Sequence, residues 1–206
     1  MSTPASSGRR VAVVTGGSGS IGGAIAARLS SDHQVAVLDR HGTIQVDLGD
    51  PDAVRTAADR VLDRYGRCDV LVHAAAMVAF GPLDELQLST WRQVQAVNVE
   101  SALLLTQAFV PGMRDRGFGR VVFIVSNSYW RPPGAHMLAY VASKGALIGI
   151  ARALAIGLGS SGIAVIAVAP GLTRTPAADV VPAEEFADVA AHQAASAGQV
   201  RSDAVR

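Results

Sequence analysis

Short apolar runs rich in β-branched residues recur along the chain, and most of them are followed by a stretch with helical periodicity. Five such runs are residues 11–15, 34–39, 69–75, 120–126 and 164–169. Runs that are apolar throughout are typical of strands buried on both faces of a parallel sheet. Their alternation with helices predicts an α/β fold with a doubly wound, Rossmann-like, mostly parallel sheet in a single domain.

The connection after the second run is too short to hold a helix. Residues 44–47 form a further candidate strand only a few residues later, whereas a parallel crossover with a helix needs about a dozen residues. We therefore expect a loop there. Asp50 and Pro51 then provide an N-cap and a first-turn proline. The helix that they predict runs to Tyr65, where Gly66 ends it.

Three more helices are predicted from periodicity. One spans residues 24–29, and a long one is capped by Ser89 and runs to Phe109. The third carries Tyr140 and ends near Leu158.

The two ends of the chain differ from the middle. Residues 1–8 are rich in Ser, Pro and Ala without an apolar stretch, which predicts a flexible tail. Residues 9–176 form the expected dinucleotide-binding core. Residues 177–206 are expected to be a mobile C-terminal segment and substrate lid, because the helical pattern at 182–197 contains few large apolar residues.

The first apolar run ends in a glycine-rich loop, and a helix follows it. Gly17, Gly19 and Gly22 match the pattern G-x-G-x-x-G, and strand, loop and helix are the context that this nucleotide-binding pattern requires. Glycines permit a tight turn and a close approach of the backbone to a pyrophosphate, which then lies at the helix N-terminus. The alternative is an ordinary glycine-rich turn without a ligand.

The second run ends in a carboxylate, Asp39, about twenty residues after the loop. A carboxylate there binds the ribose hydroxyls of an adenine nucleotide and repels a 2′-phosphate, which favours NAD over NADP. Arg40 opposes this preference because a guanidinium can bind a phosphate. A polar residue that merely ends a strand is the alternative interpretation of Asp39.

Tyr140 and Lys144 are four residues apart, and therefore lie one turn apart on the same face of a helix. A free phenol has a pKa of ~10, and bringing it to pH 7 requires roughly 4 kcal/mol. One ammonium at about 5 Å supplies roughly 3 kcal/mol at an effective dielectric near 20. We therefore expect Lys144 to supply most of the shift in the pKa of Tyr140, and a second positive charge nearby, such as an oxidised nicotinamide ring, to complete it. The alternative is a helix that carries a solvated lysine by chance.

Three other residues have simple structural interpretations. His73 is more often a satisfied core histidine than a catalyst. Asn98 lies within an apolar stripe, where its side chain is expected to bond to the local backbone. Cys68 is expected to be a small hydrophobe rather than a nucleophile. Ser126 differs, because it ends a strand at the sheet edge where ligands of parallel α/β folds bind.

Composition narrows the classes of function. The chain has 206 residues, half of them hydrophobic, and a formal charge of +1. This length fits one domain with a substantial core, and the charge gives no electrostatic reason to expect nucleic acid or an anionic membrane as a partner. The single cysteine suits a reducing cytoplasm. The apolar runs are short and interrupted, so no membrane span is expected, and we expect no metal site.

Taken together, these motifs occur in a recognisable order. They are Thr15-Gly16, Ile21-Gly22, Asp39, Asp47-Leu48, Asn98, Ser126, Tyr140-x-x-x-Lys144 and Pro170-Gly171. In this order the chain resembles the short-chain dehydrogenase/reductase family over about residues 9–176. The resemblance implies an oxidoreductase that transfers a hydride between NAD and a secondary alcohol or ketone.

The resemblance also implies a catalytic role for Asn98, Ser126, Tyr140 and Lys144. Tyr140 would be the general acid and base, and Lys144 would lower its pKa and hold the nicotinamide ribose. Ser126 and Tyr140 would bind the substrate oxygen, with Ser128 as the alternative serine. Asn98 would anchor a chain of waters that relays the proton to solvent.

The cofactor site implied by the resemblance is extensive. Its residues are Gly16, Ser18, Gly19, Ser20, Ile21, Gly22, Asp39, Asp47, Leu48, Ala74, Tyr140, Lys144, Pro170, Gly171 and Thr173. Thr173 would contact the carboxamide end of the nicotinamide. A homo-oligomer is among the assemblies that the resemblance allows.

Three features depart from the family pattern. Ser20 replaces the usual middle glycine of the loop, and residues 73–76 read His-Ala-Ala-Ala where the family has Asn-Asn-Ala-Gly. The sequence also stops at Arg206, before the last strand of the family, so we expect either a fragment or a shortened member with an exposed sheet edge. The alternative function is a dinucleotide-binding sensor or partner-binding module without catalysis.

Overall fold

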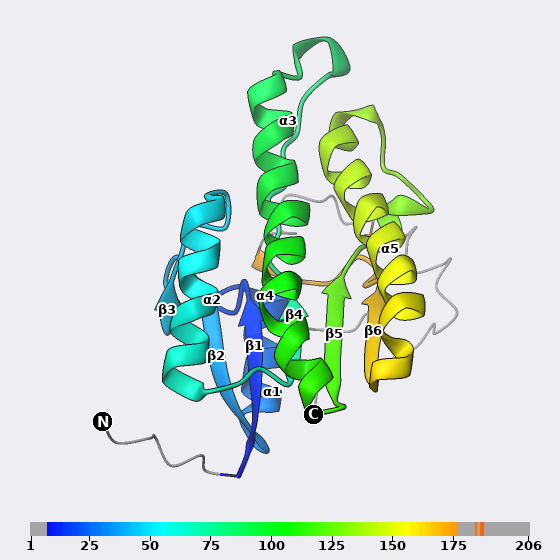
Figure 1. Cartoon of the computed structure of the whole chain (residues 1–206). Helices are drawn as coiled ribbons and strands as arrows, with labels where there is room; N and C mark the ends of the chain where they lie inside the picture. The colour runs from blue at the N-terminus through cyan, green and yellow to red at the C-terminus, as the bar shows by residue number, and fades with distance from the viewer. Residues whose placement is uncertain (1–7, 177–183, 185, 188–206) are drawn as a thin grey trace.

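Within the described residues, the chain folds around a parallel sheet of six strands (Figure 1), in the order β3-β2-β1-β4-β5-β6. The structure is a computed structural model, and it describes residues 8–176, 184 and 186–187. The strands are β1 (Arg10–Thr15), β2 (His33–Asp39), β3 (Ile44–Gln45), β4 (Val70–His73), β5 (Gly119–Ile124) and β6 (Ile163–Val168). The prediction of a doubly wound α/β fold is confirmed.

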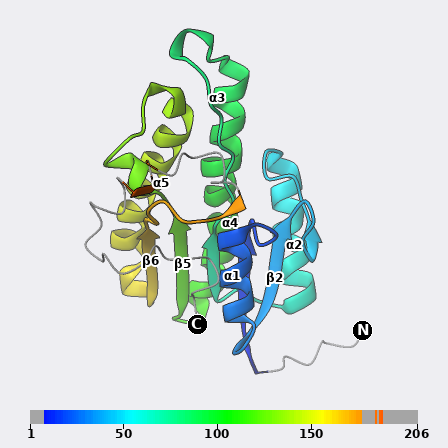
Figure 2. The same ribbon diagram turned by 180° about the vertical axis from the view of Figure 1, so that it is seen from behind.

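Helices cover both faces of the sheet (Figures 1 and 2). One face carries α2 (Pro51–Tyr65), α4 (Ser101–Asp115) and α5 (Leu138–Leu158), and the other carries α1 (Ser20–Leu29). A further helix, α3 (Leu88–Gln95), runs into α4 through a π-helical turn, η2 (Ala96–Glu100). The short 3₁₀ turns are η1 (Leu83–Glu85), η3 (Asn127–Tyr129), η4 (Ala135–Met137) and η5 (Gly159–Ser161).

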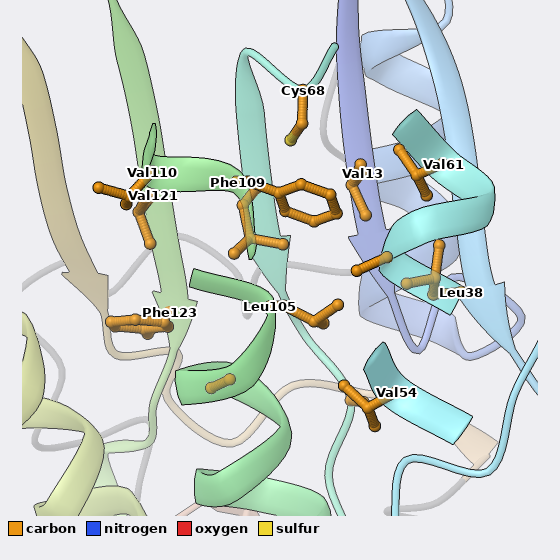
Figure 3. Packing of buried hydrophobic residues seen from close by; sticks show 14 of the residues in the cluster. Val13, Leu38, Val54, Val61, Cys68, Leu105, Phe109, Val110, Val121 and Phe123 are labelled. Carbon is orange, nitrogen blue, oxygen red and sulfur yellow. The ribbon is translucent and has the colours of Figure 1, made fainter. Parts of the chain in front are cut away.

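Two hydrophobic clusters hold these layers together. The larger one lies between the sheet and the α2, α4 and α5 layer, and Figure 3 shows Phe109 and Leu105 of α4 packed near Val13 of β1. The smaller one lies under α1 and includes Val14. Val13 and Val14 point to opposite faces because side chains alternate along a strand. This explains why β1 is apolar at successive positions.

Helix α2 confirms the start and end signals predicted for it. The Asp50 Oδ1 accepts hydrogen bonds from the amides of Asp52 and Ala53 at 2.9 and 3.2 Å. At the other end Gly66 has φ of 74°, a conformation that favours glycine. The connection between β2 and β3 is a loop, as expected.

The helices on either side of α2 differ from the prediction. Helix α1 begins at Ser20, four residues before the expected start, so its first turn contains Gly22, the last glycine of the pattern. Ser89 does not cap the long helix: α3 begins at Leu88, and no side chain caps it. The long helix is also not continuous, since η2 interrupts it. A π-turn depends on contacts with distant residues, which periodicity does not report.

Some predictions concern parts of the chain outside the described residues. These are the tail at residues 1–7 and most of the segment 177–206. Within the described residues, β6 pairs with β5 and with no other strand. The segment Ala135–Ser161, which contains α5, is by length and composition apolar enough to cross a membrane. The expectation that every apolar run is too short therefore fails for this helix, which packs on the sheet and buries Lys144.

Candidate active site

The loop between β1 and α1 leaves no room for side chains at two of its glycines. Gly16 has φ of 67°, and a Cβ on it would lie 2.7 Å from the Cα of Ala75. A Cβ on Gly22 would overlap the Gly16 carbonyl oxygen. Glycine is therefore required at both positions, and the loop folds tightly against the carboxyl end of β4.

The same loop leads into a helix start that suits an anion. Gly19 precedes α1 without a side-chain cap, and the first turn contains no acidic residue. Backbone N–H groups and the helix dipole both favour a negative ligand at such a start. Asp39 lies beside the loop, where its Oδ2 accepts a hydrogen bond from the amide of Ser18 at 3.2 Å. These residues fit a dinucleotide, with its pyrophosphate at the helix and a ribose at the carboxylate.

The other residues predicted to bind the cofactor follow the carboxyl ends of further strands. Asp47 accepts the amide two residues on at 2.8 Å, and Leu48 is buried beside it. After β6, the carbonyl of Pro170 accepts the amide of Asn127 at 3.1 Å. Thr173 donates its hydroxyl to the carbonyl of Gly171 at 3.1 Å. Because all strands are parallel, these segments lie at the same sheet edge as the glycine loop; their contact with a cofactor stays a prediction.

Tyr140, Lys144 and Ser126 come together at the carboxyl end of β5. The ammonium of Lys144 lies 5.4 Å from the centroid of the Tyr140 ring. It donates a hydrogen bond to the carbonyl of Ile124 at 2.8 Å, and the side chain is only 1% exposed. The hydroxyl of Tyr140 is hydrogen-bonded to the side chain of Ser126. The predicted tyrosine, lysine and serine therefore form one group.

The pKa of Tyr140 contradicts the sequence-based expectation. Burial raises the pKa of the phenol above its ordinary value, and the hydrogen bond with Ser126 opposes this only in part. Burial also lowers the pKa of Lys144 to about 8. Lys144 by itself therefore does not bring the phenol towards neutrality, because burial of the ring disfavours the phenolate more than these neighbours favour it.

The structure distinguishes between the two candidate serines. Ser128 is 5% exposed, and it donates both its amide and its hydroxyl to the Oγ of Ser126, at 3.2 and 2.9 Å. The hydroxyl proton of Ser126 is therefore free of Ser128 and can be donated towards Tyr140 or a substrate. Ser126 is the serine that contacts Tyr140, and Ser128 orients the Ser126 side chain through its two hydrogen bonds.

Asn98 does not bond to the local backbone, so that expectation is wrong. Its side chain is 0% exposed and forms a two-way pair with the backbone of Met77, accepting the amide at 2.7 Å and donating to the carbonyl at 3.0 Å. It also donates to the Oγ of Ser143 at 2.9 Å, and Ser143 donates to the carbonyl of Tyr140 at 2.7 Å. Asn98 thus joins the segment after β4 to the Tyr140 helix. Its role in a proton relay stays a prediction.

Two hydroxyls in this network were missed by the sequence analysis. One is the hydroxyl of Ser143, described above. The other is the hydroxyl of Thr15, whose Oγ1 accepts the amides of Ala74 and Ala75, both at 3.1 Å. The signal was present: Thr15 and His73 end neighbouring parallel strands and are directly paired in register. Residues that share a register position at the ends of adjacent strands can be expected to touch.

His73 is a satisfied core histidine, as predicted. The side chain is 0% exposed, and both ring nitrogens have partners: Nδ1 lies 3.0 Å from the Oγ1 of Thr15, and Nε2 lies 3.1 Å from the carbonyl oxygen of Asn98. Burial and the charge of Lys144 lower the pKa of His73 to about 3, although the Asn98 contact opposes this shift.

This pKa predicts a loss of stability in mild acid. The histidine titrates near pH 6.5 in the unfolded chain and near pH 3 in the folded one, so between these values the unfolded state binds the extra proton. The free energy of unfolding should fall by ~1.4 kcal/mol per pH unit below 6.5, or about 2 kcal/mol at pH 5. Urea unfolding at pH 7 and pH 5 measures it. The slope should persist in His136→Asn, an exposed histidine, and disappear in His73→Asn; a slope unchanged in the latter would contradict the assignment.

Two other kinds of site receive no support from the described residues. No group of three or more His, Cys, Asp or Glu side chains among them is placed to hold a metal ion. Cys68 is 1% exposed, and burial raises the pKa of its thiol. The thiolate, which is the nucleophilic form, is therefore disfavoured.

The fold and the site together define a class of protein: a Rossmann-like fold with a glycine loop suited to a dinucleotide. The family model for short chain dehydrogenases matches residues 10–185. The chain therefore belongs to the short-chain dehydrogenase/reductase family, and the resemblance seen in its sequence is confirmed.

Individual relatives support the same family. A hydroxy(phenyl)methylsuccinyl-CoA dehydrogenase subunit of Thauera aromatica is 37% identical over 139 residues, which is 68% of this chain but only 55% of that relative. The D-threitol dehydrogenase of Mycolicibacterium smegmatis is 30% identical, with coverage of 81% and 71%. Among solved structures, a putative gluconate 5-dehydrogenase of Beutenbergia cavernae with bound NADP has a TM-score of 0.84 and 31% identity, covering 98% of this chain and 88% of that one.

Proposed function

We propose that the protein interconverts a secondary alcohol and a ketone, with NAD as the cofactor. The observation that carries this proposal is the group formed by Tyr140, Ser126 and Lys144 at the same sheet edge as the glycine loop. A phenol held against a hydroxyl and an ammonium serves proton transfer, which a protein that only binds a dinucleotide does not need.

The roles of the side chains follow from their protonation. The raised pKa of Tyr140 keeps its hydroxyl protonated at neutral pH, so it is ready to donate a proton to a carbonyl oxygen. Ser126 can donate its hydroxyl to the same oxygen and orient it. In the opposite direction Tyr140 must first lose its own proton, and the phenolate oxygen then accepts the alcohol proton. The dinucleotide, when bound at the glycine loop, supplies the hydride chemistry.

Lys144 supplies positive charge to this reaction. Its pKa of about 8 leaves the ammonium protonated at pH 7, and its position over the Tyr140 ring stabilises negative charge on the phenol. The hydrogen bond to the Ile124 carbonyl fixes the ammonium at the end of β5. Lys144 therefore eases the step in which Tyr140 carries a negative charge.

Asp39 supports NAD as the cofactor, although three structural relatives hold NADP. We expect NADH to bind at least about tenfold more tightly than NADPH, because a carboxylate at the ribose repels a 2′-phosphate. In Asp39→Asn this preference should shrink, whereas Asp59→Asn, an exposed change on α2, should leave it intact. Fluorescence titration with both reduced cofactors measures the two dissociation constants. Tighter binding of NADPH by the wild type would refute the assignment.

The experiment that tests the activity is a turnover screen. The chain is incubated with NAD and a panel of secondary alcohols, and with NADH and the matching ketones, while absorbance of the reduced nicotinamide is followed. The names of the relatives make polyols and hydroxy acids the first members of the panel. NADH binding without turnover on any member would favour the non-catalytic sensor over the enzyme.

A further inference from the structure

His73 lies between the two halves of the site. It is the last residue of β4, and its register partners are Thr15 on β1 and Phe123 on β5. Of its two hydrogen bonds, one reaches back to the strand that carries the glycine loop, and the other reaches forward to η2. The ring is therefore in direct contact with both the nucleotide loop strand and the Asn98 segment.

The hydrogen-bond partners determine which ring nitrogen carries the proton. The Asn98 carbonyl can only accept, so Nε2 must be the donor. The Thr15 oxygen already accepts two amides, which use its two lone pairs. Its own proton must therefore point to Nδ1, which accepts it. Every donor and acceptor in this group is satisfied by a neutral ring protonated at Nε2, and by no other form.

Each end of this bridge controls a different part of the site. At the Nδ1 end, Thr15 holds the amides of Ala74 and Ala75, against which the Gly16 turn packs. At the Nε2 end, Asn98 holds Met77 and, through Ser143, the helix turn that carries Tyr140. One ring is thus hydrogen-bonded both to the strand that leads into the nucleotide loop and to the segment that is bonded to the Tyr140 helix.

We propose that His73 is a positioning residue that fixes the glycine loop and the Tyr140 helix relative to each other through its two hydrogen bonds. The kinetic part of the test of this proposal rests on the oxidoreductase function proposed above. The proposal assigns separate consequences to the two bonds: the Thr15 bond serves dinucleotide binding, and the Asn98 bond serves the catalytic step.

Two substitutions separate the bonds, because amide side chains mimic one ring nitrogen each. In His73→Asn the amide group lies where Nδ1 was, so it can still accept from Thr15 but no longer reaches Asn98. In His73→Gln the longer side chain places its NH₂ where Nε2 was, so the bond to the Asn98 carbonyl is kept and the bond to Thr15 is lost. Each variant therefore breaks one end of the bridge.

The expected results differ between the two variants. His73→Asn should lower kcat by about tenfold, the size of one lost hydrogen bond, with the NADH dissociation constant nearly unchanged. His73→Gln should weaken NADH binding by about tenfold, with kcat nearly unchanged. Hydrogen exchange gives a readout that needs no substrate: the Met77 amide should lose protection in the Asn variant, and the Ala74 and Ala75 amides in the Gln variant.

The outcomes are unambiguous when thermal unfolding is measured alongside. If both variants lower the melting temperature but leave kcat, the NADH dissociation constant and these amides unchanged, His73 only stabilises the core and the proposal is overturned. The same holds if both variants alter the same parameter. If the wild type turns over no substrate, the proposed function fails, while NADH titration and hydrogen exchange still decide whether the bridge positions the two segments.

Discussion

A Tyr140→Phe protein should bind NADH as tightly as the wild type and turn over its substrate at least about a hundredfold more slowly, since a positioned general acid or base contributes ~10²–10⁴. The substitution removes one oxygen and leaves the ring under Lys144 in place. The hydrogen bond to Ser126 is lost, so the substrate oxygen also loses one of its two hydroxyl partners. Steady-state kinetics and fluorescence titration measure the two quantities.

The matched control is Tyr65→Phe, which removes the same oxygen from a tyrosine at the end of α2. Turnover in this control should equal that of the wild type. If Tyr140→Phe retains more than about a tenth of wild-type turnover, an effect below the range of general acid catalysis, the proton comes from another group. In that case the Tyr140 assignment is wrong.

The second large effect is on stability, and it arises at the amino end of β4, away from the candidate active site. Asp69 is 0% exposed, accepts the Val11 amide at 2.9 Å, and pairs with Arg67 through two bonds of 2.7 and 2.8 Å. The Nε of Arg116 lies 3.4 Å away. Burial raises the pKa of Asp69, but Arg67, the Val11 amide and Arg116 together hold it below its usual value. The charged form is therefore the one that the fold stabilises.

Asp69→Ala should lower the free energy of unfolding by about 3 kcal/mol, because it leaves the Arg67 guanidinium and the buried Val11 amide without their acceptor. The control is Asp52→Ala, which breaks the exposed pair with Arg55 at 3.0 Å and should cost less than ~1 kcal/mol. Urea denaturation of the three proteins at pH 7 gives the comparison. Equal losses in both variants would show that burial adds nothing to the Asp69 pairs.

The sequence predicted those features that depend on neighbours along the chain. The Asp50 cap, the Pro51 start and the Gly66 end of α2 are all local, and each is found where expected. The buried strands follow from short apolar runs, and the Tyr140-to-Lys144 spacing places both residues on one helix face. These patterns need no knowledge of distant contacts, because the backbone conformation alone decides them.

The errors arise where distant residues decide the structure. The π-turn at η2 contains Asn98, whose partners Met77 and Ser143 are 21 and 45 residues away, and no local pattern reports such contacts. The pKa of Tyr140 was misjudged for a similar reason. Spacing gives the distance to Lys144, but the burial of the ring, which raises the pKa, depends on the whole tertiary structure.

The strand order also has a consequence for how the molecule assembles. The central strand β1 precedes its neighbour β4 in the sequence, and it can pair with β4 only after the intervening segment has been ordered. The Thr15 and His73 side chains that meet between these two strands are 58 residues apart. Closing so long a segment lowers the entropy of the chain before the contacts between the two strands offset that loss. Proteins dominated by such non-local pairings fold more slowly than those built from local helical contacts. Nascent or refolding chains therefore expose the unpaired edge of β1 for longer than a helical protein of this length would expose its core.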